Sequence, residues 1–320
     1  MAQPVLAFDR RTGLLDGATA VERMAAVAFF AGARVSSVWS YRGFGLGCKA
    51  VRVMLTERDI IVRLDDDALF SFPYGDSYWS LLLDQRYRYE ADLDFFLRGV
   101  ADADYTLIDC GANYGYWSVL VTSRPFGAHR AIAIEPSSQT FAQLTANAKI
   151  NGNRFKPMRR AIGAAAGSAR LRGSKHEKLS IAGPAGQSGE EVTVIALDDL
   201  VDQKIITAHG RYVVKLDVEG IEVEALTGAA RLLNSDCIVI CEEHGSDQNH
   251  TILRYILKNT DKKLFCYDPD TGHYEHLRDV ASLERIKQAR NIAYNVFATK
   301  SPFWEQRLRS LSASFRRFDR

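Results

Sequence analysis

From about residue 104 onwards, short apolar runs alternate with segments of helical periodicity, and this alternation constrains the fold more than any other feature. Strands that alternate with helices predict an α/β fold, with a mostly parallel sheet covered by helices on both faces. The runs that we predict as strands are residues 105–109, 131–135, 212–217, 237–242, 263–267 and 292–298. The segments between them that we predict as helices are residues 116–122, 139–149, 221–233 and 251–258.

Residues 1–88 form a separate N-terminal region in which helical and strand patterns are mixed, as in an α+β extension. Its predicted elements are a helix over residues 18–31 and two strands over 60–64 and 68–72. Three aspartates, residues 65–67, separate the two strands without the spacing of an EF-hand, so we interpret them as a solvated hairpin tip.

The predicted sheet domain, residues 89–300, begins with an amphipathic helix and carries one insertion. Residues 163–194 interrupt the strand–helix rhythm around a flexible glycine-rich tip, and the flanking pieces predict an inserted hairpin. The tail, residues 301–320, is a basic amphipathic helix by its pattern. Three interpretations of that helix stay open: docking on the protein's own body, a homodimer contact, or peripheral contact with an acidic membrane surface.

The longest apolar run, residues 24–33, is about half as long as a membrane span, so we interpret it as a buried helix and expect no transmembrane segment. Asp16 and Glu22 stand where a signal peptide would be positive, which predicts a cytoplasmic protein. The 5 cysteines, an odd number without a C-x-x-C pair, fit reduced core thiols. A net charge of only +2 does not indicate a nucleic-acid partner.

The segment from Asp109 to Gly115 is the sharpest chemical signal, because an apolar strand ends in an acid, then glycines, then a helix. Glycines let the backbone approach a ligand, and such a turn lies where ligands bind in open α/β sheets. An acid directly before the first glycine repels a pyrophosphate but suits a ligand with an ammonium group. S-adenosylmethionine is therefore favoured over a dinucleotide, and a loop without a ligand remains the third interpretation.

Three acidic clusters follow at the ends of the next predicted strands. Glu135, just before Pro136, can accept hydrogen bonds from both hydroxyls of a ribose, or it is an exposed glutamate at a helix start. Asp217 and Glu219 stand at the mouth of the same cleft as Asp109, unless they serve only the helix dipole. The third cluster, Glu243 with His244, would lie beside Asp217, and His244 is suited to proton transfer.

Together these motifs resemble the FkbM-family methyltransferases over roughly residues 89–298. The resemblance is carried by Asp109–Gly115, Glu135-Pro136, Asn147 with Asn151, 197–200, Lys215–Glu222 and 242–244. It implies a class I, Rossmann-like methyltransferase fold with a seven-stranded, mostly parallel sheet, in which residues 292–298 supply the antiparallel strand. It also implies O-methylation of a hydroxyl group on a sugar, a glycan or glycolipid, or a polyketide.

On this reading, S-adenosylmethionine is the cofactor and a small-molecule or saccharide is the acceptor. The expected proton acceptors are Asp217, Glu219, Glu243 and His244, and a divalent cation held by Asp217, Glu219 and Glu243 stays open. Tyr89 and Glu90 are expected at the methionine end from the resemblance alone. The remaining expected cofactor contacts are Asp109, Gly111, Ala112, Asn113, Gly115, Glu135, Pro136, Ser137, Ala161, Ile162 and Asp217.

Three rival functions stay open beside this one. The least supported is a nucleic-acid methyltransferase, which only the basic tail favours. A nicotinamide-dependent oxidoreductase needs a phosphate-binding glycine turn, which Asp109 contradicts. A catalytically inactive module that binds S-adenosylmethionine would not need acids at three successive strand ends.

Overall fold

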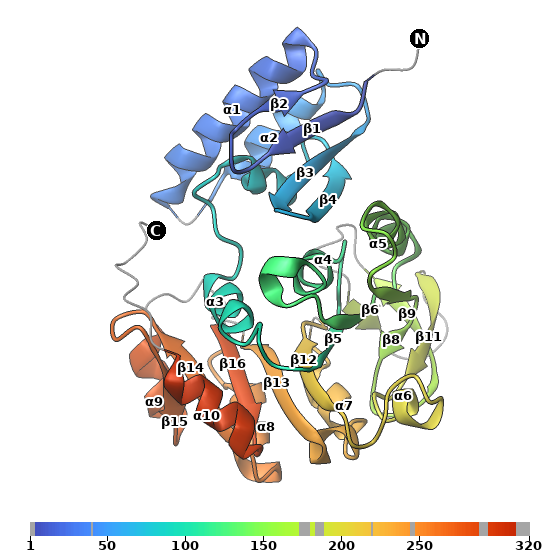
Figure 1. The fold of residues 1–320 in the computed structure, drawn as a ribbon, viewed down its shortest axis with the longest axis vertical. Coiled ribbons are helices and arrows are strands. Elements are labelled where there is room, and N and C mark those ends of the chain that lie inside the picture. The colour runs from blue at the N-terminus through green and yellow to red at the C-terminus, as the bar shows by residue number, and fades with distance from the viewer. Residues whose placement is uncertain are drawn as a thin grey trace.

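The computed structural model describes residues 4–39, 41–172, 180–182, 189–218, 220–243, 247–287 and 294–311. Its centre is a sheet in which eight described strands follow the order β15-β14-β16-β13-β12-β5-β6-β7 (Figure 1). The strands are β5 (Thr106–Cys110), β6 (Arg130–Ile134), β7 (Lys156–Met158), β12 (Arg211–Leu216), β13 (Asp236–Glu243), β14 (Lys263–Asp268), β15 (His273–Leu277) and β16 (Tyr294–Thr299).

Strand direction agrees with the expected class I methyltransferase sheet. The five strands from β7 to β13 pair in parallel, whereas β16 runs antiparallel to both β13 and β14. The antiparallel strand is therefore the one predicted from residues 292–298, of which the structure describes the part from Tyr294 onwards. Two strands of this sheet, β7 and β15, are not among the six predicted runs, and the sheet has eight described strands where the resemblance implied seven. The strand β15 is the hairpin partner of β14.

Helices cover both faces of this sheet, as the unbroken apolar character of its strands requires. One core contains Leu107, Val213 and Ile240, and the other contains Ile108, Val214 and Val239, so alternate residues of each strand face opposite sides. The first face packs against α3 (Ala91–Gly99), α4 (Tyr116–Val121), α5 (Ser138–Ile150) and α10 (Pro302–Ser310). The second packs against α6 (Asp199–Asp202), α7 (Glu222–Thr227), η3 (Leu232–Asn234), α8 (Thr251–Asn259) and α9 (Val280–Ile286).

The N-terminal region forms a small sheet of order β2-β1-β3-β4 with two helices (Figure 1). Its long helix begins with a capping box, in which the Thr19 side chain and the Glu22 carboxylate each accept a hydrogen bond from the other's backbone N–H. The interpretation of residues 24–33 as a buried helix is only half correct, because Met24 and Val27 are exposed. The elements are β1 (Leu6–Asp9), β2 (Leu15–Asp16), α1 (Ala20–Ser37), α2 (Phe44–Arg52), β3 (Asp59–Asp65), β4 (Ala68–Pro73) and η1 (Trp79–Leu83).

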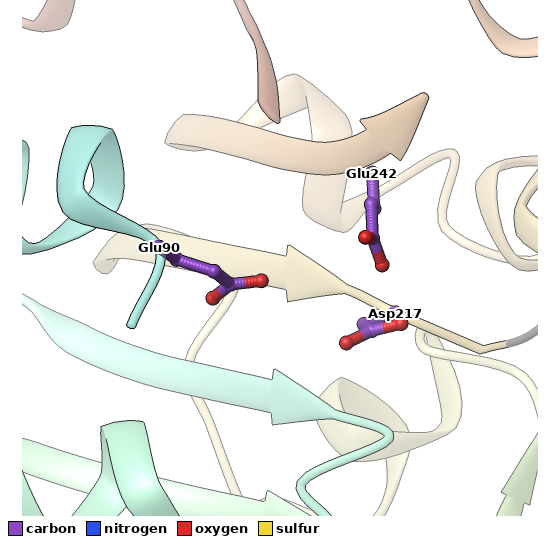
Figure 2. A group of neighbouring side chains, drawn as sticks. All are labelled: Glu90, Asp217 and Glu242. Atoms are coloured by element: carbon purple, nitrogen blue, oxygen red, sulfur yellow. The ribbon is translucent and has the colours of Figure 1, made fainter. Parts of the chain in front are cut away.

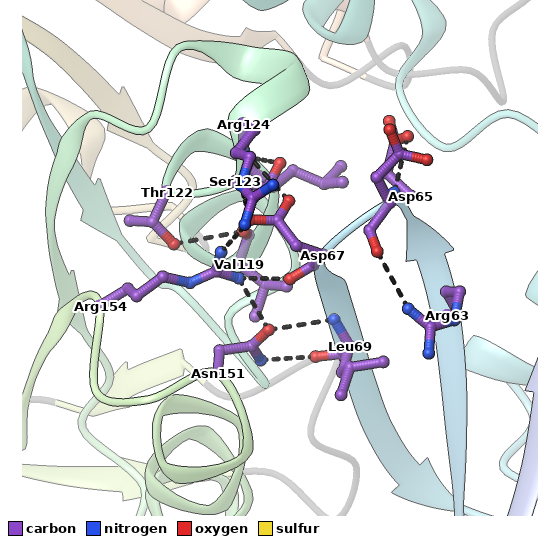
Figure 3. A network of polar contacts seen from close by, with 12 residues as sticks. Arg63, Asp65, Asp67, Leu69, Val119, Thr122, Ser123, Arg124, Asn151 and Arg154 are labelled. Atoms are coloured by element: carbon purple, nitrogen blue, oxygen red, sulfur yellow. Dashed lines mark hydrogen bonds and ion pairs between the residues drawn. The ribbon is translucent and has the colours of Figure 1, made fainter.

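The predicted hairpin of β3 and β4 is confirmed, but its tip is only partly solvated, because Asp66 is exposed whereas Asp65 and Asp67 are half-buried. Asp67 accepts a hydrogen bond from Arg154 Nη1 at 2.7 Å and another from the backbone N–H of Arg124 at 3.1 Å (Figure 3). Asp65 forms an ion pair of 3.1 Å with Arg98, which lies on α3. The tip therefore fastens the N-terminal region to the sheet domain.

The inserted hairpin is confirmed as part of a second small sheet of order β10-β9-β11-β8. Its strands are β8 (Ala161–Ile162), β9 (Gly167–Arg172), β10 (Ser180–Ala182) and β11 (Glu190–Ile195), with β9 and β11 antiparallel.

The described part of the tail docks on the protein's own body. Trp304 and Leu308, on one face of α10, are completely buried in the first core. Phe315 and Phe318, which complete the predicted apolar stripe, lie outside the described residues. No helix in the described part of the chain is both long and apolar enough to cross a membrane.

Candidate active site

The glycine turn after β5 is built around a buried carboxylate. Asp109 is buried and accepts a hydrogen bond of 2.7 Å from Ser118 Oγ on α4. Burial raises the pKa of Asp109, while the nearby Lys215 ammonium opposes that rise. The carboxylate of Asp109 near the end of β5 is therefore held in place by a side chain of α4, the helix that follows the turn.

Gly111 lets this turn touch the end of the neighbouring strand. Its φ is +76°, and a Cβ added there would lie 1.8 Å from the backbone oxygen of Asp217. The Asp217 N–H in turn donates to the carbonyl of Cys110 at 3.1 Å. Two of the predicted motifs, after β5 and after β12, are thus in backbone contact.

The turn also reaches the end of β6. The backbone N–H of Asn113 donates to Glu135 Oε2 at 3.1 Å, and the N–H of Ser137 donates to Glu135 Oε1 at 3.0 Å. Glu135 is buried, so it is not an exposed glutamate, and burial raises its pKa to about 8. Each oxygen keeps a lone pair for a further donor, which suits the hydroxyls of a ribose.

Other expected cofactor residues lie close to this loop in the chain. Gly115, with φ +87°, precedes α4, and Ser137 is the N-cap of α5 after Pro136. The backbone N–H groups of Gly111 and Ala112 both donate to the carbonyl of Ile134, at 2.9 and 3.0 Å. These two amides are therefore used inside the protein and do not point at a ligand.

Ala161 and Ile162 form β8, which pairs in parallel with β11. Both side chains are buried.

The centre of the site is a lysine surrounded by carboxylates. Lys215 Nζ lies 2.8 Å from Asp217 Oδ2 and 3.6 Å from Glu90 Oε1. Lys215 is buried, and it is paired in register with Asp109 on β5. Burial lowers its pKa, but the carboxylates of Asp217, Glu90, Asp109 and Glu242 raise it well above the ordinary value, so the ammonium stays charged.

Glu90 enters this cluster from the N-terminal side of the sheet domain. It precedes α3 with a left-handed φ of +41°, and its Oε2 accepts a hydrogen bond from Trp117 Nε1 on α4. Burial raises the pKa of Glu90 to about 7, although Lys215 pulls it down. The adjacent Tyr89 hydroxyl accepts a 3.0 Å hydrogen bond from the Tyr78 hydroxyl, so residues before the sheet domain line this side.

Glu242, and not Glu243, is the glutamate beside Asp217 (Figure 2). Side chains alternate along β13, so the two neighbours face opposite sides of the sheet. Burial, with the Asp217 and Glu90 carboxylates, raises the pKa of Glu242 to about 9. Glu243 is buried on the second face, where its Oε2 accepts from the backbone N–H of Leu253 on α8 at 3.3 Å.

Two further expected site residues, Glu219 and His244, lie outside the described residues. The prediction of their roles therefore stays a prediction.

The cluster can do two kinds of chemistry. Glu90, Asp217 and Glu242 each offer one carboxylate oxygen, and these atoms lie within 4.8 Å of one another, which is a donor set that hard cations accept. The same space contains the Lys215 ammonium, which already supplies a positive charge. Carboxylates whose pKa is raised toward neutrality can also take up a proton from a bound hydroxyl group.

Comparison with known proteins places this geometry in context. Residues 109–264 match the family model described as methyltransferase FkbM domain. The hexuronic acid methyltransferase AglP of Haloferax volcanii is 28% identical over 157 residues, which is 49% of this chain and 63% of that protein. The match thus spans less than two thirds of the relative.

Similarity to solved structures is weaker. The crystal structure of methyltransferase FkbM from Methylobacillus flagellatus is 18% identical with a TM-score of 0.40, and the match covers 61% of this chain and 43% of that one. The crystal structure of M. jannaschii TYW2 in complex with AdoMet is 13% identical with a TM-score of 0.38, and the match covers 76% of this chain and 85% of that one. With such scores, the assignment of the fold rests on the strand order itself.

Proposed function

Because residues 109–264 belong to the FkbM methyltransferase family, we propose that this chain transfers a methyl group from S-adenosylmethionine to a hydroxyl oxygen of a sugar-like acceptor. The observation that carries the proposal is the carboxylate cluster around Lys215, which lies directly beside the glycine turn of the family motif. The hexuronic acid methyltransferase among its relatives suggests a uronic acid or a related sugar as the acceptor.

The residues present fit S-adenosylmethionine at two points. Glu135 is buried, receives two backbone N–H groups and keeps acceptor capacity for the ribose hydroxyls. The carboxylates of Asp109, Asp217 and Glu90 outnumber the single Lys215 ammonium among them, so acceptor capacity remains for the amine of the cofactor. The cofactor, when bound, supplies a methyl carbon that is already electrophilic.

The chain's own residues then have two tasks. They must hold the acceptor oxygen in line with the methyl carbon, and positioning of this kind supplies a large part of the acceleration in such reactions. They must also take the hydroxyl proton as the oxygen–carbon bond forms and the carbon–sulfur bond breaks. We assign this proton to the cluster of Glu90, Asp217 and Glu242, with Glu219 and His244 as further candidates from the sequence.

We propose that Lys215, and not a divalent cation, balances the charge of this cluster. The ammonium is within 2.8 Å of Asp217 and 3.6 Å of Glu90, so a cation bound by the same oxygens would meet a buried like charge.

The remaining parts of the chain take supporting roles in this proposal. We assign residues 1–88 to an accessory region that helps to enclose the acceptor, residues 89–300 to the methyltransferase domain, and residues 301–320 to a tail whose described part contains α10. We keep the cytoplasm as the proposed compartment, because all five cysteines are buried free thiols.

The proposal is tested first by isothermal titration with S-adenosylmethionine, S-adenosylhomocysteine and NAD. Binding of the first two without NAD is expected, whereas NAD binding alone would identify an oxidoreductase. Transfer of a labelled methyl group to glucuronic acid and to its glycosides then tests turnover. The label should survive mild alkali, because the methyl ether formed on a hydroxyl group is stable there. Release of the label would mean that a methyl ester had formed on the carboxyl group instead. Cofactor binding without transfer to any sugar would support an inactive binding module.

A further inference from the structure

The long helix α1 carries a second apolar face that no described part of the chain covers. Ala25, Phe29 and Ala33 are buried in the first core, whereas Met24 is 66% exposed and Val27 is 68% exposed. Val35 and Val38 are exposed too, at spacings that put them on the same side of the helix as Met24 and Val27. Figure 1 shows α1 on the outer side of the N-terminal region, away from the main sheet.

The following segment extends this apolar character. Trp39 is exposed at the end of α1, Leu46 is exposed on α2, and Val53, just after α2, is 87% exposed. Outside the first 54 residues, only Leu257, at 37%, counts among the exposed large hydrophobic side chains of the described chain. The apolar surface is therefore local, and a concentration of this kind marks a site of interaction.

The charges on this segment are almost all positive. Its only acid between residues 20 and 54 is Glu22, which is buried and bound to Arg58 at 2.6 Å. The five cations of the same stretch are exposed; one of them, Arg34, lies 4.0 Å from Asp84. They are Arg23, Arg34, Arg42, Lys49 and Arg52.

We propose that α1 and α2, residues 20–54, dock the protein on an anionic membrane surface. Apolar side chains bordered by Arg and Lys are what a helix lying in the headgroup region presents to acidic lipids. A second copy of the chain fits less well, because a symmetric contact would bring like charges together. This docking surface is separate from the cluster around Lys215, so the inference does not depend on the proposed function.

The test is sedimentation of the full-length protein with vesicles of phosphatidylcholine mixed with phosphatidylglycerol, against vesicles of phosphatidylcholine alone. The parent protein should bind the mixed vesicles, and added salt should weaken that binding. The variant M24E/V27E/V35E should bind the mixed vesicles at least about tenfold more weakly than the parent protein, because three negative charges replace apolar side chains of the face. The matched control is Leu257→Glu, on α8, which should bind like the parent.

Far-ultraviolet circular dichroism of each variant shows whether the fold is kept, and exposure of the substituted side chains predicts that it is. A further variant, R23Q/K49Q, should lose binding to the mixed vesicles while leaving the apolar face intact. No binding by the parent protein, or equal binding by the triple variant, would overturn the inference. Light scattering can overturn the inference as well. If the parent protein is a dimer and M24E/V27E/V35E is a monomer, a second copy of the chain occupies the face.

Discussion

The side-chain amide of Asn147 forms with the backbone of Ser71 the pair of hydrogen bonds that a neighbouring strand would form. Its Oδ1 accepts from the Ser71 N–H at 2.6 Å, and its Nδ2 donates to the Ser71 carbonyl at 3.0 Å. Asn151, one turn later at the C-cap of α5, does the same for Leu69, at 3.0 and 2.6 Å (Figure 3). The edge strand β4 is thus completed by side chains of α5 and its C-cap, which belong to the part of the chain that covers the main sheet.

The first prediction concerns Asn147, whose Nδ2 also donates to the carbonyl of Tyr114 in the glycine turn at 2.9 Å. Replacing Asn147 by Leu keeps the volume but removes the three hydrogen bonds of its amide, so the buried Ser71 N–H loses the oxygen that accepts it. We expect a loss of about 2–4 kcal/mol in the free energy of unfolding, measured by urea titration.

The matched control is Asn259→Leu, at the exposed end of α8, which should change stability by less than about 0.5 kcal/mol. Equal stability of the two variants would mean that the pairing of Asn147 with β4 does not hold the two regions together.

Much of this fold follows from local patterns in the sequence. The predicted strands lie within one or two residues of the observed ones, because an apolar run of strand length bounded by turn residues is a local signal. The contact of Asn147 with Ser71 has no such signal, since the two residues are 76 positions apart. Its only trace in the sequence was the pair of asparagines at a spacing of four in the family resemblance.

The prediction from the sequence that Glu243 lies beside Asp217 is wrong, and this error has a different cause. Both faces of a parallel sheet are buried, so the apolar pattern of β13 does not show which residues share a side. The observed register pairs Lys215 with Ile240. Because side chains alternate, Asp217 then lies opposite Glu242. The register depends on contacts across the sheet, which the sequence does not show. With the register known, Glu242 would have been predicted as the neighbour of Asp217.

A second prediction follows from the three glutamates whose pKa is raised by burial, to about 7 for Glu90, 8 for Glu135 and 9 for Glu242. In the folded state they hold their protons at a pH where the unfolded chain has lost them. The stability of the ligand-free protein should therefore fall as the pH rises from about 5 to about 9, where the unfolded state binds fewer protons. Urea midpoints across that range measure the trend.

Glu135→Gln should flatten part of this slope, because a neutral amide has no proton to lose, and it should also weaken binding of S-adenosylmethionine. A slope that is the same in the parent and in the variant would show that Glu135 does not titrate in this range.

A third prediction concerns divalent cations. Because the Lys215 ammonium lies 2.8 Å from Asp217, methyl transfer should be unchanged by EDTA and by added magnesium. The measurement is the initial rate of transfer to the acceptor before and after chelation and dialysis. If chelation abolished transfer and magnesium restored it, the carboxylates of Glu90, Asp217 and Glu242 would be ligands of a cation.

The last prediction separates the two adjacent glutamates of β13. Glu242 lies within 4.8 Å of Asp217 and Glu90, whereas Glu243 faces α8 on the other side of the sheet. If Glu242 takes the hydroxyl proton, Glu242→Gln should lower kcat by about 10²–10⁴-fold, with little change in the affinity for S-adenosylmethionine. Glu243→Gln is the matched variant and should act mainly on stability. The pH profile adds a second readout, since removal of a proton acceptor should abolish the rise of kcat with pH. A kcat that falls in Glu243→Gln but not in Glu242→Gln would place the proton acceptor elsewhere and restore the arrangement that the sequence first suggested.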